Sequence, residues 1–409
     1  MTISHRLQSC FMLFGFMLGV LAPANLFAIQ DSATVPADSV QEKTVRLATF
    51  NISFNRDRAG MLKERLAEGK GKNFERIAKI IQRVRPDVIL LNEFDYDKSG
   101  EGVQLFQEHF LGKAHDDLKP INYPHTFIRP VNTGVDSGLD MDHDGVKKTG
   151  ADAYGYGKFP GQYGMAVLSK YPLLEKQART FQNFLWKDMP DALVPIDPES
   201  GIPYFHPPVM EVFRLSSKSH WDVPVSIDGA VVHFLVAHPT PPTFDGPEDR
   251  NGKRNHDEIR MLADYVGGKA EYLYDDNGKH GGFADGEHFV IAGDLNADPV
   301  DGASHDGAAA QLLDHPAINA AVPPKSSGGT KFAALQGRKN SEQKGDPAND
   351  TSDFTDRTVG NLRVDYCLPS KTLEVKSQAV FWPEPDDPEA DWVKATDHRM
   401  VYIDVAIPK

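Results

Sequence analysis

The stretch "VIAGDLNADP" (290–299) places oxygen-bearing side chains directly after an apolar run. Val290, Ile291 and Ala292 have the character of a buried strand, and Asp294, Asn296 and Asp298 follow them closely. Asp, Asn and Gly favour turns, and Pro299 ends a strand, so a plain turn is one explanation. The other explanation is a site for a hard cation or a phosphate at the end of the strand. The rest of the chain has to distinguish the two.

The 409 residues are expected to divide into a leader, a linker and one large domain. Residues 1–28 carry Arg6, an apolar run and a closing "ANLFA", which is the pattern of a signal peptide. Residues 29–43 are small, polar and charged, and they predict a disordered linker. Residues 44–409 are the predicted domain. No later run is long and apolar enough to span a membrane. We therefore expect a secreted or periplasmic protein without a transmembrane segment, and a monomer.

Charge and cysteine content narrow the function classes. The formal net charge is −14, whereas proteins that grip nucleic acid through many phosphates are usually basic. Nucleic acid stays a candidate substrate, but the charge does not favour it. Cys10 lies in the predicted signal peptide and Cys367 is the other cysteine, so the mature chain cannot form an intramolecular disulfide.

Short apolar runs separated by long loops predict an α+β fold. One amphipathic helix is expected within 73–86 and another at 256–266. The long connections at 112–162, 176–229 and 300–355 exceed ordinary lengths, and such loops usually carry function. The pattern favours two packed, mainly antiparallel sheets flanked by helices over a parallel doubly wound sheet. The predicted strands lie within 44–54, 87–94, 163–173, 230–240, 288–296, 363–370 and 400–407.

Polar residues of one chemical kind recur where these strands begin or end. Burying one of them would be unremarkable, but strand ends on one edge of a sheet can bring distant residues to one pocket. Carboxylate and amide oxygens suit Mg²⁺ or Mn²⁺. A histidine oriented by a carboxylate can move a proton. A zinc protease is disfavoured, because no cysteine cluster or HExxH is present. The residues concerned are Asn51, Glu93, His238, Asp294, Asn296, Asp365, Asp397 and His398.

Seven short motifs follow one another along the chain in a fixed order. They are "TFNIS", "LLNEF", "GMAVLSKYP", "AHPTPP", "GDLNADP", "RVDYCLPS" and "TDHRMVYIDV". This ordered series resembles the endonuclease/exonuclease/phosphatase superfamily, whose fold is similar to that of DNase I, and "GDLNADP" and the terminal "TDH" are its most specific pieces. The resemblance spans roughly residues 44–409 and implies a four-layer α/β sandwich of two packed sheets between helices.

The resemblance also implies a role for each matching residue. Glu93 corresponds to the principal metal ligand, with Asn51 and Asp397 also at the metal. Asp294 and Asn296 correspond to the pair that positions the nucleophile and the phosphate. His398 corresponds to the histidine at the reacting phosphate, and Asp365 to the carboxylate that orients it. His238 stands where DNase-like and sphingomyelinase-like members keep a catalytic histidine, in contrast to abasic-site enzymes.

The sequence departs from the family pattern at two places near these motifs. Gln162 stands where abasic endonucleases carry a tyrosine, although Tyr163 is adjacent, and this weakens a DNA-repair function. The stretch 238–260 is unlike the plainer histidine loop of most members. Its Arg254, Asn255 and Arg260 are candidates to bind the substrate, with helix capping and solvated charge as the alternative.

A third feature lies in the first long insertion. Asp140, Asp142 and Asp144 alternate before Gly145, which matches the D-x-D-x-D-G opening of a calcium loop. Position twelve from Asp140 is Ala151 rather than glutamate, and Asp152 is the candidate substitute. The prediction is a structural Ca²⁺, with a solvated acidic loop as the alternative.

Together these features predict an exported phosphoesterase that depends on Mg²⁺ or Mn²⁺. We expect it to hydrolyse phosphodiester bonds by direct attack of water, without a covalent intermediate. A phosphomonoesterase that scavenges phosphate is the first alternative. An inactive binding module on the same fold is the second, but it predicts lost polar strand ends and here all are filled. The substrate, the number of metals and the assignment of the histidines as acid and base stay open.

Overall fold

Apolar residues alternate along the long strands and place both faces of each strand in a core. In β1 (Thr44–Asn51), Val45 and Leu47 pack on one side, and Ala48 and Phe50 pack on the other. Successive side chains of a strand point to opposite faces, so such a strand is covered on both. The computed structural model describes residues 43–408. The predicted signal peptide (1–28) and all of the predicted linker except Lys43 lie outside the described residues.

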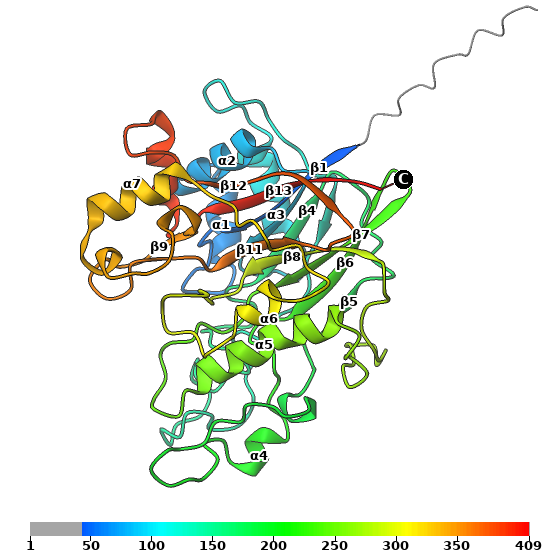
Figure 1. Ribbon diagram of the computed structural model, residues 1–409, viewed down its shortest axis with the longest axis vertical. Helices are drawn as coiled ribbons and strands as arrows, with labels where there is room; N and C mark the ends of the chain where they lie inside the picture. Colours follow the sequence, from blue (N-terminus) through cyan, green and yellow to red (C-terminus); the bar gives the residue numbers. More distant parts are fainter. Residues whose placement is uncertain (1–42, 409) are drawn as a thin grey trace, which may run out of the picture. The chain divides into compact units, whose positions relative to one another are not determined.

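Two sheets form the centre of the described chain (Figure 1). Each contains one parallel pairing, β1 with β2 and β7 with β8, and the remaining pairings are antiparallel. The first sheet has the order β12 (Glu374–Phe381), β13 (Met400–Ala406), β1, β2 (Val88–Asn92), β4 (Met165–Ser169) and β3 (His125–Phe127). The second has the order β11 (Asp365–Pro369), β8 (His288–Asp294), β7 (Ala230–Ala237), β6 (His220–Ile227) and β5 (Arg179–Thr180).

Helices cover the outer faces of both sheets. The inner faces pack on each other through residues such as Leu47 and Leu90 of the first sheet and Phe234 and Val290 of the second. Figure 1 shows α2 on the first sheet and the long α5 along the second. The described helices are α1 (Met61–Ala67), α2 (Lys72–Val84), α3 (Glu101–Phe106), α4 (Pro207–Met210), α5 (Arg250–Val266), α6 (Ala310–Leu313) and α7 (Ser327–Gln336).

The predicted α+β sandwich is therefore confirmed, with several differences in detail. The helix predicted at 256–266 begins earlier, because α5 starts at Arg250. Strands β6 and β12 were absent from the prediction, as was the short ribbon of β9 (Ser352–Asp353) and β10 (Asn361–Leu362). None of the helices in the described part is long and apolar enough to cross a membrane.

Candidate active site

The polar strand ends meet at one edge of the paired sheets. β1 and β2 run parallel with Asn51 opposite Asn92, so Glu93 emerges beside Asn51. β7 and β8 are also parallel, and their carboxyl ends deliver His238 and Asp294. β11 runs antiparallel to β8 and places Asp365 opposite Asp294. Since β13 is antiparallel to β1, the residues before it reach the same edge. Topology thus gathers residues that are hundreds of positions apart.

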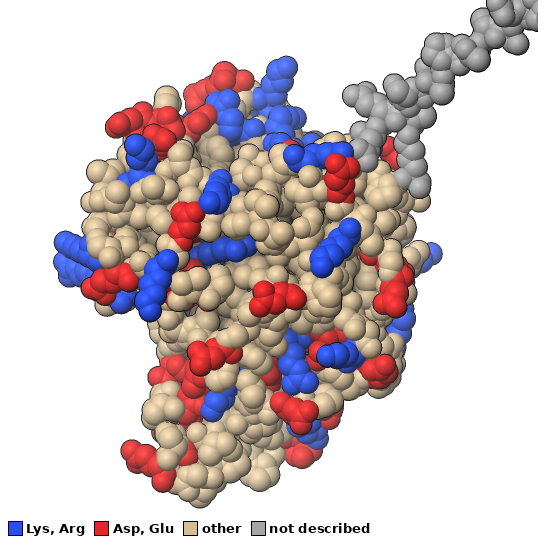
Figure 2. Space-filling model, viewed as in Figure 1, with Lys and Arg blue, Asp and Glu red and all other residues tan. Residues whose placement is uncertain are grey.

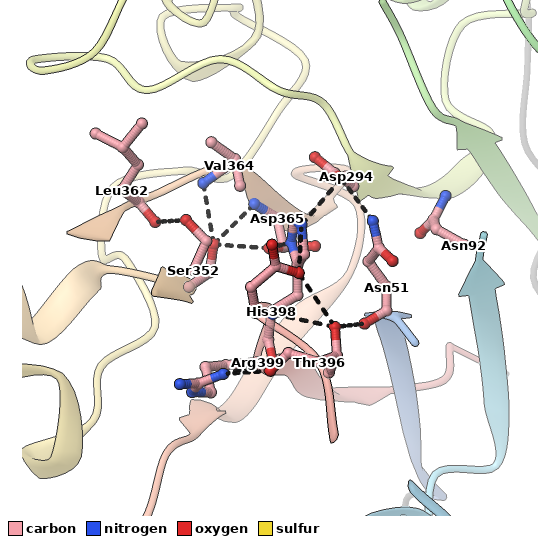
Figure 3. Close-up of polar contacts among 12 residues, drawn as sticks. Asn51, Asn92, Asp294, Ser352, Leu362, Val364, Asp365, Thr396, His398 and Arg399 are labelled. Atoms are coloured by element: carbon pink, nitrogen blue, oxygen red, sulfur yellow. Dashed lines mark hydrogen bonds and ion pairs between the residues drawn. The ribbon is translucent and has the colours of Figure 1, made fainter. Parts of the chain in front are cut away.

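Asn51 connects the two sheets at the centre of this edge (Figure 3). Its Nδ2 donates to Glu93 Oε1 at 3.2 Å and to Asp294 Oδ2 at 3.0 Å. Its own Oδ1 accepts from the backbone N–H of Ser53, and the side chain is fully buried. A buried amide with these bonds holds both carboxylates in place.

His398 is held by a carboxylate and faces a second one. Its Nδ1 lies 2.9 Å from Asp365 Oδ2, and its Nε2 lies 3.6 Å from Asp294 Oδ2 (Figure 3). The Thr351 hydroxyl donates to the same Asp365 oxygen at 2.9 Å. Burial alone would lower the pKa of His398, but the charges of Asp365 and Asp294 outweigh it and raise this pKa to about 10.

His238 lies on the other side of Asp294 in a different environment. Its Nε2 is 3.4 Å from Asp294 Oδ2, while its Nδ1 is buried without a hydrogen-bond partner. Burial, followed by the charges of Lys218 and His398, holds the pKa of His238 well below its usual value. Two histidines whose surroundings push their pKa values apart are suited to opposite proton-transfer roles.

Glu93 and Asn296 adopt the left-handed backbone conformation. Glu93 has φ of 61° and Asn296 has φ of 53°. Non-glycine residues rarely adopt this region, and such residues cluster at functional sites. Each lies just beyond a strand end, where the chain turns sharply and presents its side chain to the edge.

The donor set fits a divalent cation. Asp294, Asp365 and His398 each offer one ligand atom, and these atoms lie within 4.8 Å of one another. Asp365 Oδ1 is buried without a partner, and burial raises the pKa of both Asp365 and Glu93. A cation bound at this edge of the sheets would favour the charged forms of these carboxylates. Asp397, the third predicted metal ligand, has its Oδ1 3.9 Å from His398 Nε2 and is half exposed.

The three predicted substrate-binding residues of α5 have other partners. Asn255 is fully buried and donates to the carbonyls of Thr240 and Leu295 at 2.8 Å each. Arg254 lines the cavity described below, but its guanidinium donates to the carbonyls of Leu215, Tyr154 and Arg214. Arg260 pairs with Asp264 and lies outside that lining. In this structure the three residues are thus engaged with the protein itself.

Two residues that the sequence did not single out, Lys218 and Glu258, belong to this site. Lys218, just before β6, and Tyr163 both line the cavity, whereas Gln162 is buried and donates to the Arg56 carbonyl. Glu258 of α5 is buried and accepts from the backbone N–H groups of Ser217 and Thr240 at 2.6 Å each. The early start of α5 puts Asn251, Arg254, Asn255 and Glu258 on one helix face.

The predicted calcium loop brings its three carboxylates together. Single oxygens of Asp140, Asp142 and Asp144 lie within 4.8 Å of one another, and Asp140 Oδ1 is buried without a partner. Asp152 does not join them, contrary to the expected substitution. Its carboxylate accepts from the backbone of Met141 and from both the backbone and hydroxyl of Thr149, so it anchors the loop instead.

A cavity of about 1560 Å³ opens over the polar strand ends. The three long loops predicted to carry function supply about half of its lining residues, and the segment 240–254 supplies a further part. Met141, Phe205 and Phe213 form an apolar part, and residues 298 and 300–304 with parts of 339–359 form a more polar part. The strand ends contribute Glu93, His238, Asp294, Asn296, Asp397 and His398.

The profile of the Endonuclease/Exonuclease/phosphatase family matches residues 48–398. The chain belongs to the endonuclease/exonuclease/phosphatase family. Members of this family are phosphoester hydrolases that generally use divalent metal ions, and the fold and acidic–histidine cluster of this member fit that general activity.

Solved structures similar to this family member include three bacterial proteins. An endonuclease/exonuclease/phosphatase from Beutenbergia cavernae is 17% identical, with 90% of this chain and 72% of that chain covered at a TM-score of 0.47. An endonuclease/exonuclease/phosphatase family protein from Leptotrichia buccalis is 14% identical, with 89% of this chain and 100% of that chain covered at a TM-score of 0.46. Sphingomyelinase C from Streptomyces griseocarneus is 15% identical, with 89% of this chain and 100% of that chain covered at a TM-score of 0.45. Among curated proteins, none matches the sequence.

Proposed function

We propose that the protein is an exported, divalent-metal-dependent phosphoesterase that hydrolyses phosphodiester bonds by direct attack of water. The observation that carries this proposal is the cluster of Asp294, Asp365 and His398 beside Glu93 and His238, all at one edge of the sheets. Oxygen and imidazole donors at one point suit both a hard cation and proton transfer.

The proposed roles combine the family resemblance with the contacts in the structure. Glu93, Asn51 and Asp397 would hold the cation, which, when bound, offsets negative charge on the phosphate. Asp294, which accepts the Asn296 backbone N–H at 3.0 Å, would position the attacking water together with Asn296. His398 and His238 flank Asp294, so one can accept the proton of the water and the other can protonate the leaving oxygen. A new P–O bond forms to water as the ester P–O bond breaks, without a covalent intermediate.

A diester is favoured over a monoester because the cavity extends well beyond the cluster. Its volume of about 1560 Å³ exceeds a typical small-molecule site, and its lining includes Met141, Phe205 and Phe213 as well as His398 and Asp294. A second ester arm therefore has room. Figure 2 shows acidic and basic residues interspersed on the visible face of the described chain, without a continuous basic stripe. Nucleic acid thus stays the less favoured substrate.

The test is hydrolysis by the purified protein of DNA, a lipid phosphodiester, bis(4-nitrophenyl) phosphate and 4-nitrophenyl phosphate, with and without EDTA. We expect diester hydrolysis that EDTA abolishes and Mg²⁺ or Mn²⁺ restores. Hydrolysis of the monoester alone would establish a phosphomonoesterase, and binding without hydrolysis would establish an inactive module. Export is tested separately by the mass of the mature protein, which should lack residues 1–28.

A further inference from the structure

We propose that Lys218 is a phosphate-binding residue of this site, and that its ammonium donates to a non-bridging oxygen of the scissile phosphate. This inference rests on the proposed phosphoester hydrolysis and adds a fixed cation to it. Lys218 would stabilise negative charge on the phosphate oxygens as the attacking water adds. Its proposed part is that of a hydrogen-bond donor, and it exchanges no proton in the reaction.

Lys218 is built into the cavity wall rather than attached to its surface. It precedes β6 and is only 6% exposed, yet it lines the same cavity as Glu93, His238 and Asp294. Its own carbonyl accepts the Asn132 backbone N–H at 2.8 Å. The preceding residue, Ser217, donates its backbone N–H to Glu258. The backbone that carries the ammonium is therefore held on both sides.

The ammonium has bonding capacity that the protein leaves unused. A lysine ammonium has three donors, and its one hydrogen bond among the described residues is a long one of 3.4 Å to the Pro239 carbonyl. No carboxylate in the described chain comes within ion-pair distance of it. Two other buried cations are ion-paired, Arg179 with Asp275 at 2.8 Å and Arg399 with Asp353 at 2.8 Å, and a third, Arg254, donates to three backbone carbonyls.

An unpaired buried ammonium lowers the stability of the folded protein, and a role in binding phosphate would explain why it is present. Burying a charge is unfavourable unless it is paired and hydrogen-bonded. The charged groups that act on it are Glu258 first and then Glu93 and Asp294 of the site, while the cation Arg254 acts in the opposite direction. These interact with Lys218 through space without engaging its donors. A phosphate oxygen in the cavity would supply the missing acceptor.

The excess of negative charge at the site also favours a phosphate-binding role for Lys218. Glu93, Asp294, Asp365 and Asp397 would together repel an anionic phosphate, and a bound cation offsets only part of that charge. A preorganised cation in a site shielded from water acts strongly on charge that develops in the transition state. The lysines at the cavity mouth are different, because Lys339 pairs with Glu342 and Lys344 is exposed.

The competing explanation is that Lys218 merely screens the metal-binding carboxylates. The two explanations differ in what the loss of the charge changes. A screening residue should alter the affinity for Mg²⁺ and leave the affinity for phosphate unchanged. A phosphate-binding residue should do the reverse.

The experiment compares the full mature chain with Lys218→Met, Lys218→Arg and the control Lys331→Met, an exposed lysine on α7 outside the cavity lining. Calorimetry measures the affinity for inorganic phosphate in EDTA and the affinity for Mg²⁺. Hydrolysis of bis(4-nitrophenyl) phosphate gives kcat and KM, and thermal unfolding monitors the fold. Methionine matches the length of the lysine stem without its charge.

For Lys218→Met we expect phosphate affinity to fall at least about tenfold and kcat to fall about a hundredfold, as for loss of one charged transition-state donor. Mg²⁺ affinity should stay close to that of the wild type, and the unfolding midpoint should not fall, since an unpaired charge is removed. Lys218→Arg should recover much of the phosphate affinity, and Lys331→Met should behave as the wild type.

Three results would overturn the inference. They are wild-type phosphate affinity and kcat in Lys218→Met, a changed Mg²⁺ affinity with unchanged phosphate affinity, and a lowered unfolding midpoint with no recovery in Lys218→Arg. If instead the wild type binds phosphate through Lys218 but hydrolyses no ester, the proposed function fails while the binding inference holds.

Discussion

At the scale of single residues, Glu93 is the side chain on which the proposed metal site depends most. Glu93→Gln keeps the shape and the acceptor for Asn51 Nδ2 but removes the charge that attracts a hard cation. We expect Mg²⁺ affinity to fall and turnover to drop by on the order of a hundredfold. Calorimetry and steady-state kinetics measure both. If Glu93→Gln turned over substrate at the wild-type rate, Glu93 would not be a metal ligand.

The second residue-scale prediction concerns the pair formed by His398 and Asp365. Because Asp365 Oδ2 accepts from His398 Nδ1 at 2.9 Å, it sets the tautomer and the orientation of the ring. Asp365→Asn should therefore lose most of the activity that His398→Ala loses, within about tenfold. Asp404→Asn is the matched control, since it breaks an ion pair with Arg46. An unchanged rate in Asp365→Asn would show that the pairing has no role in catalysis.

At the scale of secondary-structure elements, α5 holds the loops of the site in place. Glu258 accepts from the backbone of Ser217 and Thr240, next to Lys218 and close to His238. Glu258→Ala leaves two buried N–H groups unpaired, which costs about 2–6 kcal/mol of unfolding free energy at 1–3 kcal/mol each. We expect a lower unfolding midpoint and at least about a tenfold loss of kcat. The exposed Glu271→Ala serves as the control. Unchanged stability of Glu258→Ala would refute the role of α5.

The calcium loop is the second element with a testable behaviour. Its three carboxylates converge and Asp140 Oδ1 lacks a partner, so Ca²⁺ should bind there and order the loop. Limited proteolysis of 137–157 should slow when calcium is added, and Asp142→Ala should abolish this protection without loss of catalytic metal. The control variant Asp117→Ala, which changes an exposed aspartate outside the loop, should keep the protection by calcium. Equal cleavage with and without calcium would leave a solvated acidic loop.

At the scale of the whole molecule, buried carboxylates make stability depend on pH. Burial, reinforced by Asp298, Asp301 and Asp346, raises the pKa of Asp350 to about 8. The folded protein then binds this proton more tightly than the unfolded chain. The stabilisation is complete below about pH 4 and is lost as the pH rises through about 8.

Asp350→Asn should remove this dependence. Relative to the wild type, the variant should gain unfolding free energy between about pH 4 and 8, by on the order of a few kcal/mol. Denaturant unfolding at several pH values measures the difference. The control variant Asp306→Asn, at an exposed position, should show no pH-dependent change in unfolding free energy relative to the wild type. A constant difference across this range would mean that Asp350 ionises normally.

The family membership, the fold class and the candidate residues at the strand ends could be predicted from local patterns. Val290 to Ala292 followed by Asp294 is visible in the sequence because apolar strands and polar turns are properties of adjacent residues. The same holds for "LLNEF" and Glu93. The roles assigned to these residues stay predictions, but their gathering at one edge agrees with the topology.

Local patterns also have limits that particular elements illustrate. A proline is unfavourable inside a strand, yet Pro224 lies within β6. It is tolerated because β5, the neighbour of β6 on that side, pairs only with Trp221 and Asp222 and does not reach Pro224. β12 is a partly exposed edge strand and lacks a continuous apolar run. Neither feature can be recognised without its neighbours.

The sequence by itself determined which polar residues follow the predicted strands, such as Glu93 after 88–92 and Asp294 after 290–292, since alternation and turn chemistry act over a few neighbouring positions. Only the tertiary structure decided that Asn51 joins Glu93 to Asp294, that Glu258 holds the loops beside Lys218, and that Lys218 lies buried without a partner carboxylate. These features depend on chain segments far apart in sequence. Their contacts arise from strand order and packing between sheets, which no local pattern encodes.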